Sequence, residues 1–407
     1  MVKGLSNTHG LVSRRGMKAT RDAEVVRQLR EAGAIPMPCQ TVPELVCGFD
    51  ATTSCSAPQP PTLTHQQDAR GSSARGALLT SCGTPLSVGS DLGGSIRVPS
   101  FFCGVFGHKP TLGWVSMEGN KPLPYINKDK SEDREDGGVG PMCRCTADLG
   151  AVSWRGGAPG GGLAAGVAQT TRQPQDMVKI AQHEENKMTL VVAICPPLPA
   201  WCPSLHRWVE GMESPRCRAT EPPLRKALYA ARRHLQTTFG ATTCQFQWPL
   251  DMAHATDVWL DRYEIQESGE PSLLTNMKNR ESNANLPEEW LRWLCGRGRH
   301  TFPLLLHASS VLAKKPRDPR FSWKNVQKYF LETLGQNGVL LVPTMPQVAP
   351  LHGELLSSVK HLGINAIFSA PEMPSTAVPL GLSKDGLPLG LLARCHRGGT
   401  SGPGIGA

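Results

Sequence analysis

The chain lacks any long apolar segment. No run of about 18 apolar residues occurs in its 407 residues, so the sequence predicts no membrane-spanning helix. Its 13 cysteines include no C-x-x-C pair, and the nearest approach to one is Cys143-x-Cys145. No cysteine and histidine set has the spacing of a zinc site, so we expect no bound metal.

The sequence also lacks a nucleic-acid-binding signature. Its 43 lysines and arginines exceed its 34 aspartates and glutamates and give a net charge of +9, but the basic residues are scattered and aromatic residues make up only 6%. We therefore expect a solvated surface or affinity for anionic lipid, and no nucleic-acid partner. No signal peptide is recognisable at Met1, which favours an intracellular protein with reduced thiols, in the cytosol or at a membrane surface.

The most informative segment places one serine directly after two glycines. Residues 89–100 read GSDLGGSIRVPS. Glycines let consecutive peptide units turn inward without a Cβ clash, so several N–H groups can point at one atom. A nucleophilic serine needs such donors, because the tetrahedral intermediate of amide hydrolysis carries a negative oxygen. We predict Ser95 as the nucleophile, and we predict an oxyanion hole formed by the N–H groups of Leu92, Gly93, Gly94 and Ser95.

Two charged residues, Asp91 and Arg97, flank this glycine turn. A charge held there without a partner is costly, so we expect the two side chains to brace the turn as a buried ion pair and not to contact substrate.

Three motifs resemble the amidase signature enzymes and, within them, the fatty-acid amide hydrolases. They are Gly71-Ser72-Ser73, the segment 89–100, and FCGVFGHKP over 102–110. The resemblance implies that Ser95 forms an acyl-enzyme and that Ser72 bridges it to an upstream lysine base. A desolvated lysine amine can be neutral near pH 7 and serve as a general base. The resemblance also implies that no metal or organic cofactor is needed. It further implies that His108 and Cys143 are structural and that Lys109 lies too far along a fixed motif to act as the base.

The sequence departs from this pattern at two catalytic positions. In the family the lysine precedes the segment matching residues 4–10 by about six residues, roughly 20 Å of extended chain, whereas Lys3 adjoins that segment directly. We therefore predict that the chain begins just after its own base. Ala74 and Arg75 stand where the family has glycines after the serine that matches Ser72. The alternative to an active enzyme is thus an inactive amidase-like protein or fragment that keeps a lipid-binding fold.

Repeated units of a helix, a glycine and a short apolar strand predict an α/β fold. Helices are predicted over 21–32 with Thr20 as N-cap, over 222–239 and over 323–334. Strands are predicted over 34–36, 242–248 and 339–342, with a hairpin formed by 378–382 and 387–392. The resemblance implies the amidase signature fold, a mixed central sheet flanked by helices on both faces.

One amidase signature domain is expected over residues 1–393, followed by a disordered tail over 394–407. Two tracts within the domain, about 48–70 and about 150–180, contain few large apolar side chains. We predict that these tracts are divergent or disordered.

Residues 286–312 combine tryptophans, leucines and arginines. Trp290 and Trp293 lie close to Arg292 and Arg297, a composition suited to the lipid headgroup boundary. The alternative is a helix packed on the domain, since most apolar stripes belong to cores. The fatty-acid amide hydrolases place a membrane-docking helical cap in this part of the sequence. The resemblance therefore leaves two alternatives for residues 286–312, peripheral contact with a membrane and packing on the domain.

The sequence thus supports two functions. The first is a serine amidase of the Ser-Ser-Lys type that hydrolyses fatty-acid amides to a fatty acid and an amine, and the second is the inactive form described above. A third possibility, the amidase component of a transamidation complex, is disfavoured by the match over 101–110 and 339–350. No oligomeric state is predicted.

Overall fold

The structure is a computed structural model that describes most of the chain. The described residues are 1–37, 44–46, 73–112, 114–120, 138–151, 189–192, 220–245, 258, 273–278, 282–312, 322–335, 338–351, 362–369 and 373–395.

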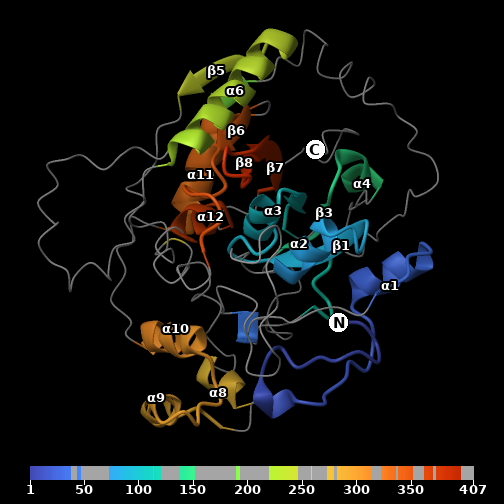
Figure 1. Ribbon diagram of the computed structural model, residues 1–407, viewed down its shortest axis with the longest axis vertical. Helices are drawn as coiled ribbons and strands as arrows, with labels where there is room; N and C mark the ends of the chain where they lie inside the picture. Colours follow the sequence, from blue (N-terminus) through green and yellow to red (C-terminus); the bar gives the residue numbers. More distant parts are fainter. Residues whose placement is uncertain are drawn as a thin grey trace, which may run out of the picture.

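A mixed sheet runs through this described part, with eight strands in the order β1-β3-β2-β7-β8-β6-β4-β5 (Figure 1). The strands are β1 Leu86–Asp91, β2 Phe106–Lys109, β3 Gly138–Cys143, β4 Thr189–Val192, β5 Thr242–Gln245, β6 Gly338–Val342, β7 Ser375–Leu382 and β8 Pro388–Cys395. The two pairs that β4 forms are parallel, and the other pairs are antiparallel. The predicted α/β class with a mixed sheet is confirmed.

Helices make up most of the remaining regular structure. They are α1 Glu24–Glu31, α2 Ser73–Thr80, α3 Arg97–Cys103, α4 Thr146–Ala151, α6 Pro222–Phe239, α8 Leu273–Met277, α9 Leu286–Leu294, α10 Phe302–Leu312, α11 Trp323–Leu334 and α12 Leu362–Ser369, with short 3-10 helices at Val12–Arg14 and Glu44–Val46. None of the helices in the described ranges is long and apolar enough to cross a membrane.

Helices cover both faces of the sheet. On one face, Leu341 of β6 and Leu391 of β8 pack against Leu228 of α6. The residues adjacent to these in sequence, Leu340 in β6 and Leu392 in β8, belong to the cluster formed with α11 and α12. Because side chains alternate along a strand, this second cluster lies on the opposite face. The predicted flanking of the sheet by helices is therefore confirmed.

Several predicted elements are confirmed in detail. The helices α6 and α11 have their predicted bounds. Gly240 adopts the left-handed conformation, with φ at 63°, and ends α6. The predicted hairpin is formed by β7 and β8, which are both longer than predicted. The first four residues of the predicted strand 242–248 form β5, and its last three lie outside the described residues.

The predicted start of the first helix is wrong. Helix α1 begins at Glu24 after Ala23, and Thr20 is not its N-cap. The residues before the helix are bound to the amino-terminal segment instead. The Ala23 amide donates to the Met1 carbonyl at 2.9 Å, and the Asp22 carboxylate accepts from the amide of residue 3 at 2.6 Å.

The predicted strand at 34–36 is also wrong. Residues 34–37 form no strand, and the Ile35 side chain is 89% exposed. An apolar run of two residues before a proline is too short to identify a buried strand.

The observed strand β8 passes the predicted domain boundary. It continues through Cys395, and Arg394 within it is buried, so the tail predicted to begin at 394 cannot begin there. Residues 396–407, the tract 48–70 and residues 152–180 of the second tract lie outside the described residues.

Candidate active site

Ser95 lies in the loop 92–96, which joins the end of β1 to the start of α3. Its side chain is half-buried. Helix α3 ends at Gly104, whose left-handed conformation, with φ at 67°, returns the chain into β2. The predicted nucleophile therefore lies at the strand-to-helix junction of a β1-α3-β2 unit.

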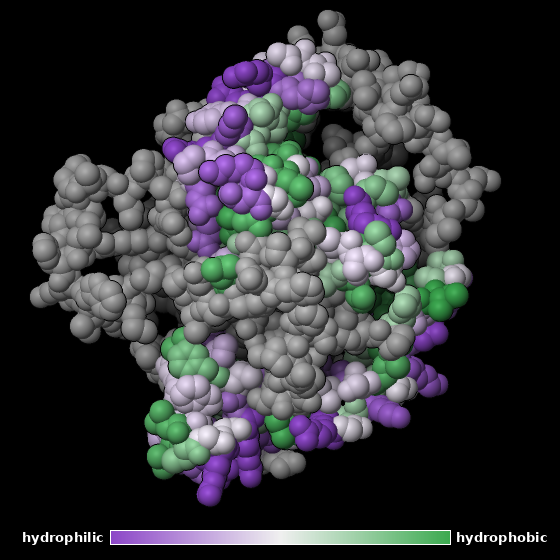
Figure 2. Space-filling view, viewed as in Figure 1, coloured by the Kyte–Doolittle hydropathy of each residue, from purple (hydrophilic) through white to green (hydrophobic). Residues whose placement is uncertain are grey.

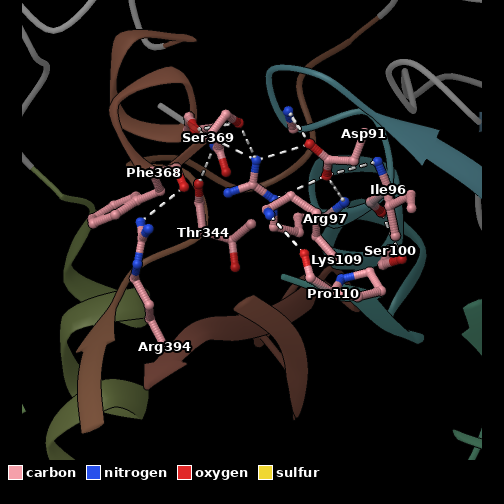
Figure 3. A network of polar contacts seen from close by, with 12 residues as sticks. Asp91, Ile96, Arg97, Ser100, Lys109, Pro110, Thr344, Phe368, Ser369 and Arg394 are labelled. Atoms are coloured by element: carbon pink, nitrogen blue, oxygen red, sulfur yellow. Dashed lines mark hydrogen bonds and ion pairs between the residues drawn. The ribbon is translucent and has the colours of Figure 1, made fainter. Parts of the chain in front are cut away.

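The carboxylate of Asp91, the last residue of β1, holds this loop. Oδ1 accepts a hydrogen bond from the Gly94 amide at 2.8 Å, and Oδ2 accepts from the Ile96 amide at 3.1 Å (Figure 3). Gly94 has φ at 117°, a conformation that residues with side chains rarely adopt. A Cβ atom there would lie 3.0 Å from Cβ of Asn365, so the position requires glycine on two grounds.

Arg97, the first residue of α3, pairs with the same carboxylate. Its Nε donates to Oδ2 and its Nη2 to Oδ1 of Asp91, both at 2.9 Å, and both side chains are fully buried. Burial by itself raises the pKa of Asp91, but the charges of Arg97 and Lys109 and the Gly94 amide lower it to about 2. The expected ion pair that braces the glycine turn is confirmed.

The loop is also held by α12, which the sequence did not connect to it. Arg97 Nη2 donates to Oγ of Ser369 at 2.7 Å, and Nδ2 of the Asn365 side chain donates to the Thr344 carbonyl at 2.6 Å. Arg394 of β8 donates from Nη1 to the Phe368 carbonyl at 2.8 Å (Figure 3). The sequence pattern could have indicated that Arg394 is buried. Arg394 lies two residues after Leu392 in an apolar strand, so both side chains face the same buried side of the sheet.

The four predicted oxyanion donors are not equivalent. The Gly94 amide already donates to Asp91, so this N–H group is engaged within the loop. The other amide donors to the carboxylate are Ile96 and Arg97, which were not predicted for the oxyanion hole. The other three predicted donors are the amides of Leu92, Gly93 and Ser95.

The predicted bridging serine, Ser72, lies outside the described residues. Helix α2 begins at the next residue, and it packs closely on α3 because residue 76 is glycine. A Cβ atom at Gly76 would overlap Sγ of Cys103. The Lys3 side chain is exposed, and Lys109 is buried with its Nζ donating to the Pro110 carbonyl at 2.9 Å (Figure 3).

His108 and Cys143, which were expected to be structural, both have pKa values displaced by burial. His108 Nδ1 lies 2.8 Å from Oγ1 of Thr376, and burial together with the charge of Lys109 lowers its pKa to about 4. Burial raises the pKa of the Cys143 thiol to about 12, and the thiol donates to the Cys145 carbonyl at 3.1 Å. Both groups are therefore neutral at pH 7.

No group of three or more histidine, cysteine, aspartate or glutamate side chains within the described ranges could hold a metal ion.

A model of the Amidase family matches residues 1–153, a range that contains Asp91, Ser95 and Arg97. Human fatty-acid amide hydrolase 2 is 27% identical over 404 residues, which cover 96% of this chain and 69% of that protein. The chain is therefore similar to the amidase signature enzymes. Fatty-acid amide hydrolase 1 of Sus scrofa is 36% identical over a shorter stretch of 152 residues, 36% of this chain and 25% of that protein.

Solved structures support the amidase signature fold. The structure of 6-aminohexanoate cyclic dimer hydrolase in complex with substrate aligns with a TM-score of 0.66, covers 98% of this chain and 79% of its own, and is 19% identical. At this identity the likeness concerns the fold alone.

Proposed function

We propose that this protein is a serine amidase of the Ser-Ser-Lys type that hydrolyses fatty-acid amides to a fatty acid and an amine. The elements from α1 to β8 form its single catalytic domain, and Ser95 is its nucleophile. The observation that carries the proposal is the half-buried Ser95 on a loop held by the Asp91–Arg97 pair. The similarity to human fatty-acid amide hydrolase 2 over 96% of the chain supports the substrate class.

In the proposed reaction, Oγ of Ser95 attacks the amide carbonyl carbon and loses its proton through Ser72 towards a lysine base. The carbonyl oxygen becomes negative and accepts hydrogen bonds from the amides of Leu92, Gly93 and Ser95. The amine then leaves with a proton, and water hydrolyses the acyl-serine ester. The Asp91 carboxylate contributes by fixing the backbone of the loop before substrate binds, so that little reorganisation accompanies the reaction.

Neither lysine considered from the sequence supplies the base. The Lys3 side chain is exposed, and the Lys109 ammonium group donates to the Pro110 carbonyl. The proposed reaction therefore requires another lysine of the chain as its base, and a chain without such a base is the second candidate, an inactive amidase-like protein. The two candidates make opposite predictions for catalysis by the folded chain.

Hydrolysis of long-chain acyl amides of a fluorogenic amine separates them. We expect the wild-type chain to hydrolyse them, and Ser95→Ala to lower kcat/KM by roughly a thousandfold or more, because the nucleophile is lost. Ser87→Ala, which changes a half-buried serine of the preceding strand, serves as the matched control and should retain activity. A folded wild-type chain without activity supports the inactive form, and activity in Ser95→Ala rules out the proposed nucleophile.

We also infer a peripheral membrane contact at α9. Leu291 and Leu294 on this helix are 62% and 72% exposed, and Arg292 lies between them in sequence. The other side of the helix packs inward, where Leu286 and Trp290 join the apolar cluster shared with α8 and α10. Figure 2 shows green, hydrophobic residues beside purple, hydrophilic ones over this part of the surface. The helix thus packs on the domain and still offers an apolar edge to a lipid headgroup layer.

A further inference from the structure

Three buried polar side chains form one row across the centre of the sheet. Lys109 of β2 pairs with Ser375 of β7, which in turn pairs with Arg394 of β8. Directly paired residues of neighbouring strands project to the same face of a sheet. Each of the three is only 1% exposed. Two cationic side chains therefore flank a serine hydroxyl inside the protein.

Arg97 joins this row from α3 on the same face. It is fully buried, and its charge lowers the pKa of Arg394 further below the ordinary value, after the larger effect of burial. Asp91 is the carboxylate that pairs with Arg97. Two buried guanidinium groups, those of Arg97 and Arg394, thus accompany the Asp91 carboxylate, which pairs with the first of them.

The other buried carboxylates of the described residues lie elsewhere. Glu44 pairs with His300 at 2.8 Å, and Glu289 pairs with Lys278 at 3.1 Å. These groups belong to the region of α8, α9 and α10 and do not offset the charges of the row.

Several hydrogen-bond donors of this region are buried without a partner in the part of the chain that the structure describes. They are Nη1 of Arg97, Nε and Nη2 of Arg394, Oγ1 of Thr344 and Oγ of Ser375. Arg394 lies over the rings of Phe330 and Phe368 at 5.1 and 5.2 Å, which stabilises its charge but leaves these N–H groups unsatisfied. Leaving a buried charged donor unsatisfied is costly, so a ligand that accepts from these groups is strongly favoured.

We propose that the Arg97–Arg394 cluster, formed by Arg97, Lys109, Thr344, Ser375 and Arg394, binds a small monovalent anion of chloride size. A spherical anion accepts hydrogen bonds from any direction, which suits donors that come from α3, three strands of the sheet and the segment after β6. Figure 3 shows Arg97, Lys109, Thr344 and Arg394 of this cluster. Its charge offsets part of the cationic excess. The bound anion also stabilises Arg97 in its pairing with Asp91 and thereby the serine loop. This site goes beyond the proposed hydrolase activity and does not depend on it.

Thermal unfolding tests the site directly. Purified protein is measured at pH 7 over increasing sodium chloride, with sodium gluconate keeping the ionic strength constant. We expect Tm to rise by several degrees with saturation, because a ligand that binds only the folded state stabilises it, and we expect bromide to replace chloride. Arg394→Met should abolish this response, and Ser375→Ala should weaken the apparent chloride affinity by roughly tenfold. Arg225→Met, at an exposed arginine of α6, is the control and should respond like the wild type.

The proposal is overturned if Tm shows no saturable dependence on chloride, or if Arg394→Met keeps the dependence unchanged. If Arg394→Met does not fold, Ser375→Ala decides, and an unchanged chloride affinity in that variant overturns the proposal. Because no step of this experiment measures amide hydrolysis, its outcome is independent of the proposed function.

Discussion

Replacing Asp91 with asparagine tests the physical basis of the serine loop. The carboxylate accepts from the amides of Gly94, Ile96 and Arg97 and from two nitrogens of the Arg97 side chain. In Asp91→Asn the side chain keeps its shape, but one acceptor oxygen becomes an NH2 group. That group faces donors, and Arg97 becomes a buried cation without a counter-charge.

We expect this change to cost about 3–5 kcal/mol of the free energy of unfolding, the range found when one partner of a buried ion pair is removed. The burial of both side chains supports the upper part of this range, since neither group can be solvated by water. The same change should also loosen the loop and slow any reaction at Ser95.

Urea unfolding of the wild type and the variant measures the loss. The matched control is Glu118→Gln, which makes the same carboxylate-to-amide change in a pair with Arg21 whose side chains are 55% and 56% exposed. An exposed pair contributes less than about 1 kcal/mol, so the control should remain close to the wild type. If Asp91→Asn costs no more than Glu118→Gln, the buried pair does not hold the loop and the reasoning is wrong.

Two further predictions concern pH and membranes. The pKa of Asp91 is lowered from 3.8 to about 2, so its stabilising effect is complete above pH 4 and is lost as the pH falls towards 2. The difference in unfolding free energy between the wild type and Asp91→Asn should therefore shrink by about 2 kcal/mol between pH 5 and pH 2, and a constant difference in urea titrations would argue against this pKa. Replacing both Leu291 and Leu294 with serine should weaken sedimentation with anionic phospholipid vesicles by about tenfold or more, because two exposed apolar side chains are lost. Leu382→Ser, at a 63% exposed leucine of β7, is the control, and equal binding by all variants would exclude α9 as the contact.

Much of the fold could be predicted because its signals are local. The bounds of α6 follow from apolar residues at helical spacing and from Gly240, which ends the helix. The pairing of Asp91 with Arg97 could be predicted because the two residues lie only six positions apart, on either side of a glycine turn. Such signals need no knowledge of distant parts of the chain.

The start of α1 and the contacts between α12 and the serine loop could not be predicted in this way. Residues 20–23 resemble a helix start, but their hydrogen bonds to Met1 and to the amide of residue 3 compete with the helix. Ser369 and Asn365 contact Arg97 and Gly94 across about 270 positions of sequence, and no local pattern indicates such a contact. The use of the Gly94 amide by Asp91 also depends on the detailed geometry of the loop.

The measurement that tests the central claim most directly is peptide mapping after exposure of the folded chain to a fluorophosphonate probe. Such probes form a covalent bond with an activated serine oxygen, so the adduct reports the nucleophile itself. The account predicts one adduct, on the peptide that contains Ser95, and its loss in Ser95→Ala. An adduct at another serine, or none in a sample that unfolds cooperatively, would contradict it.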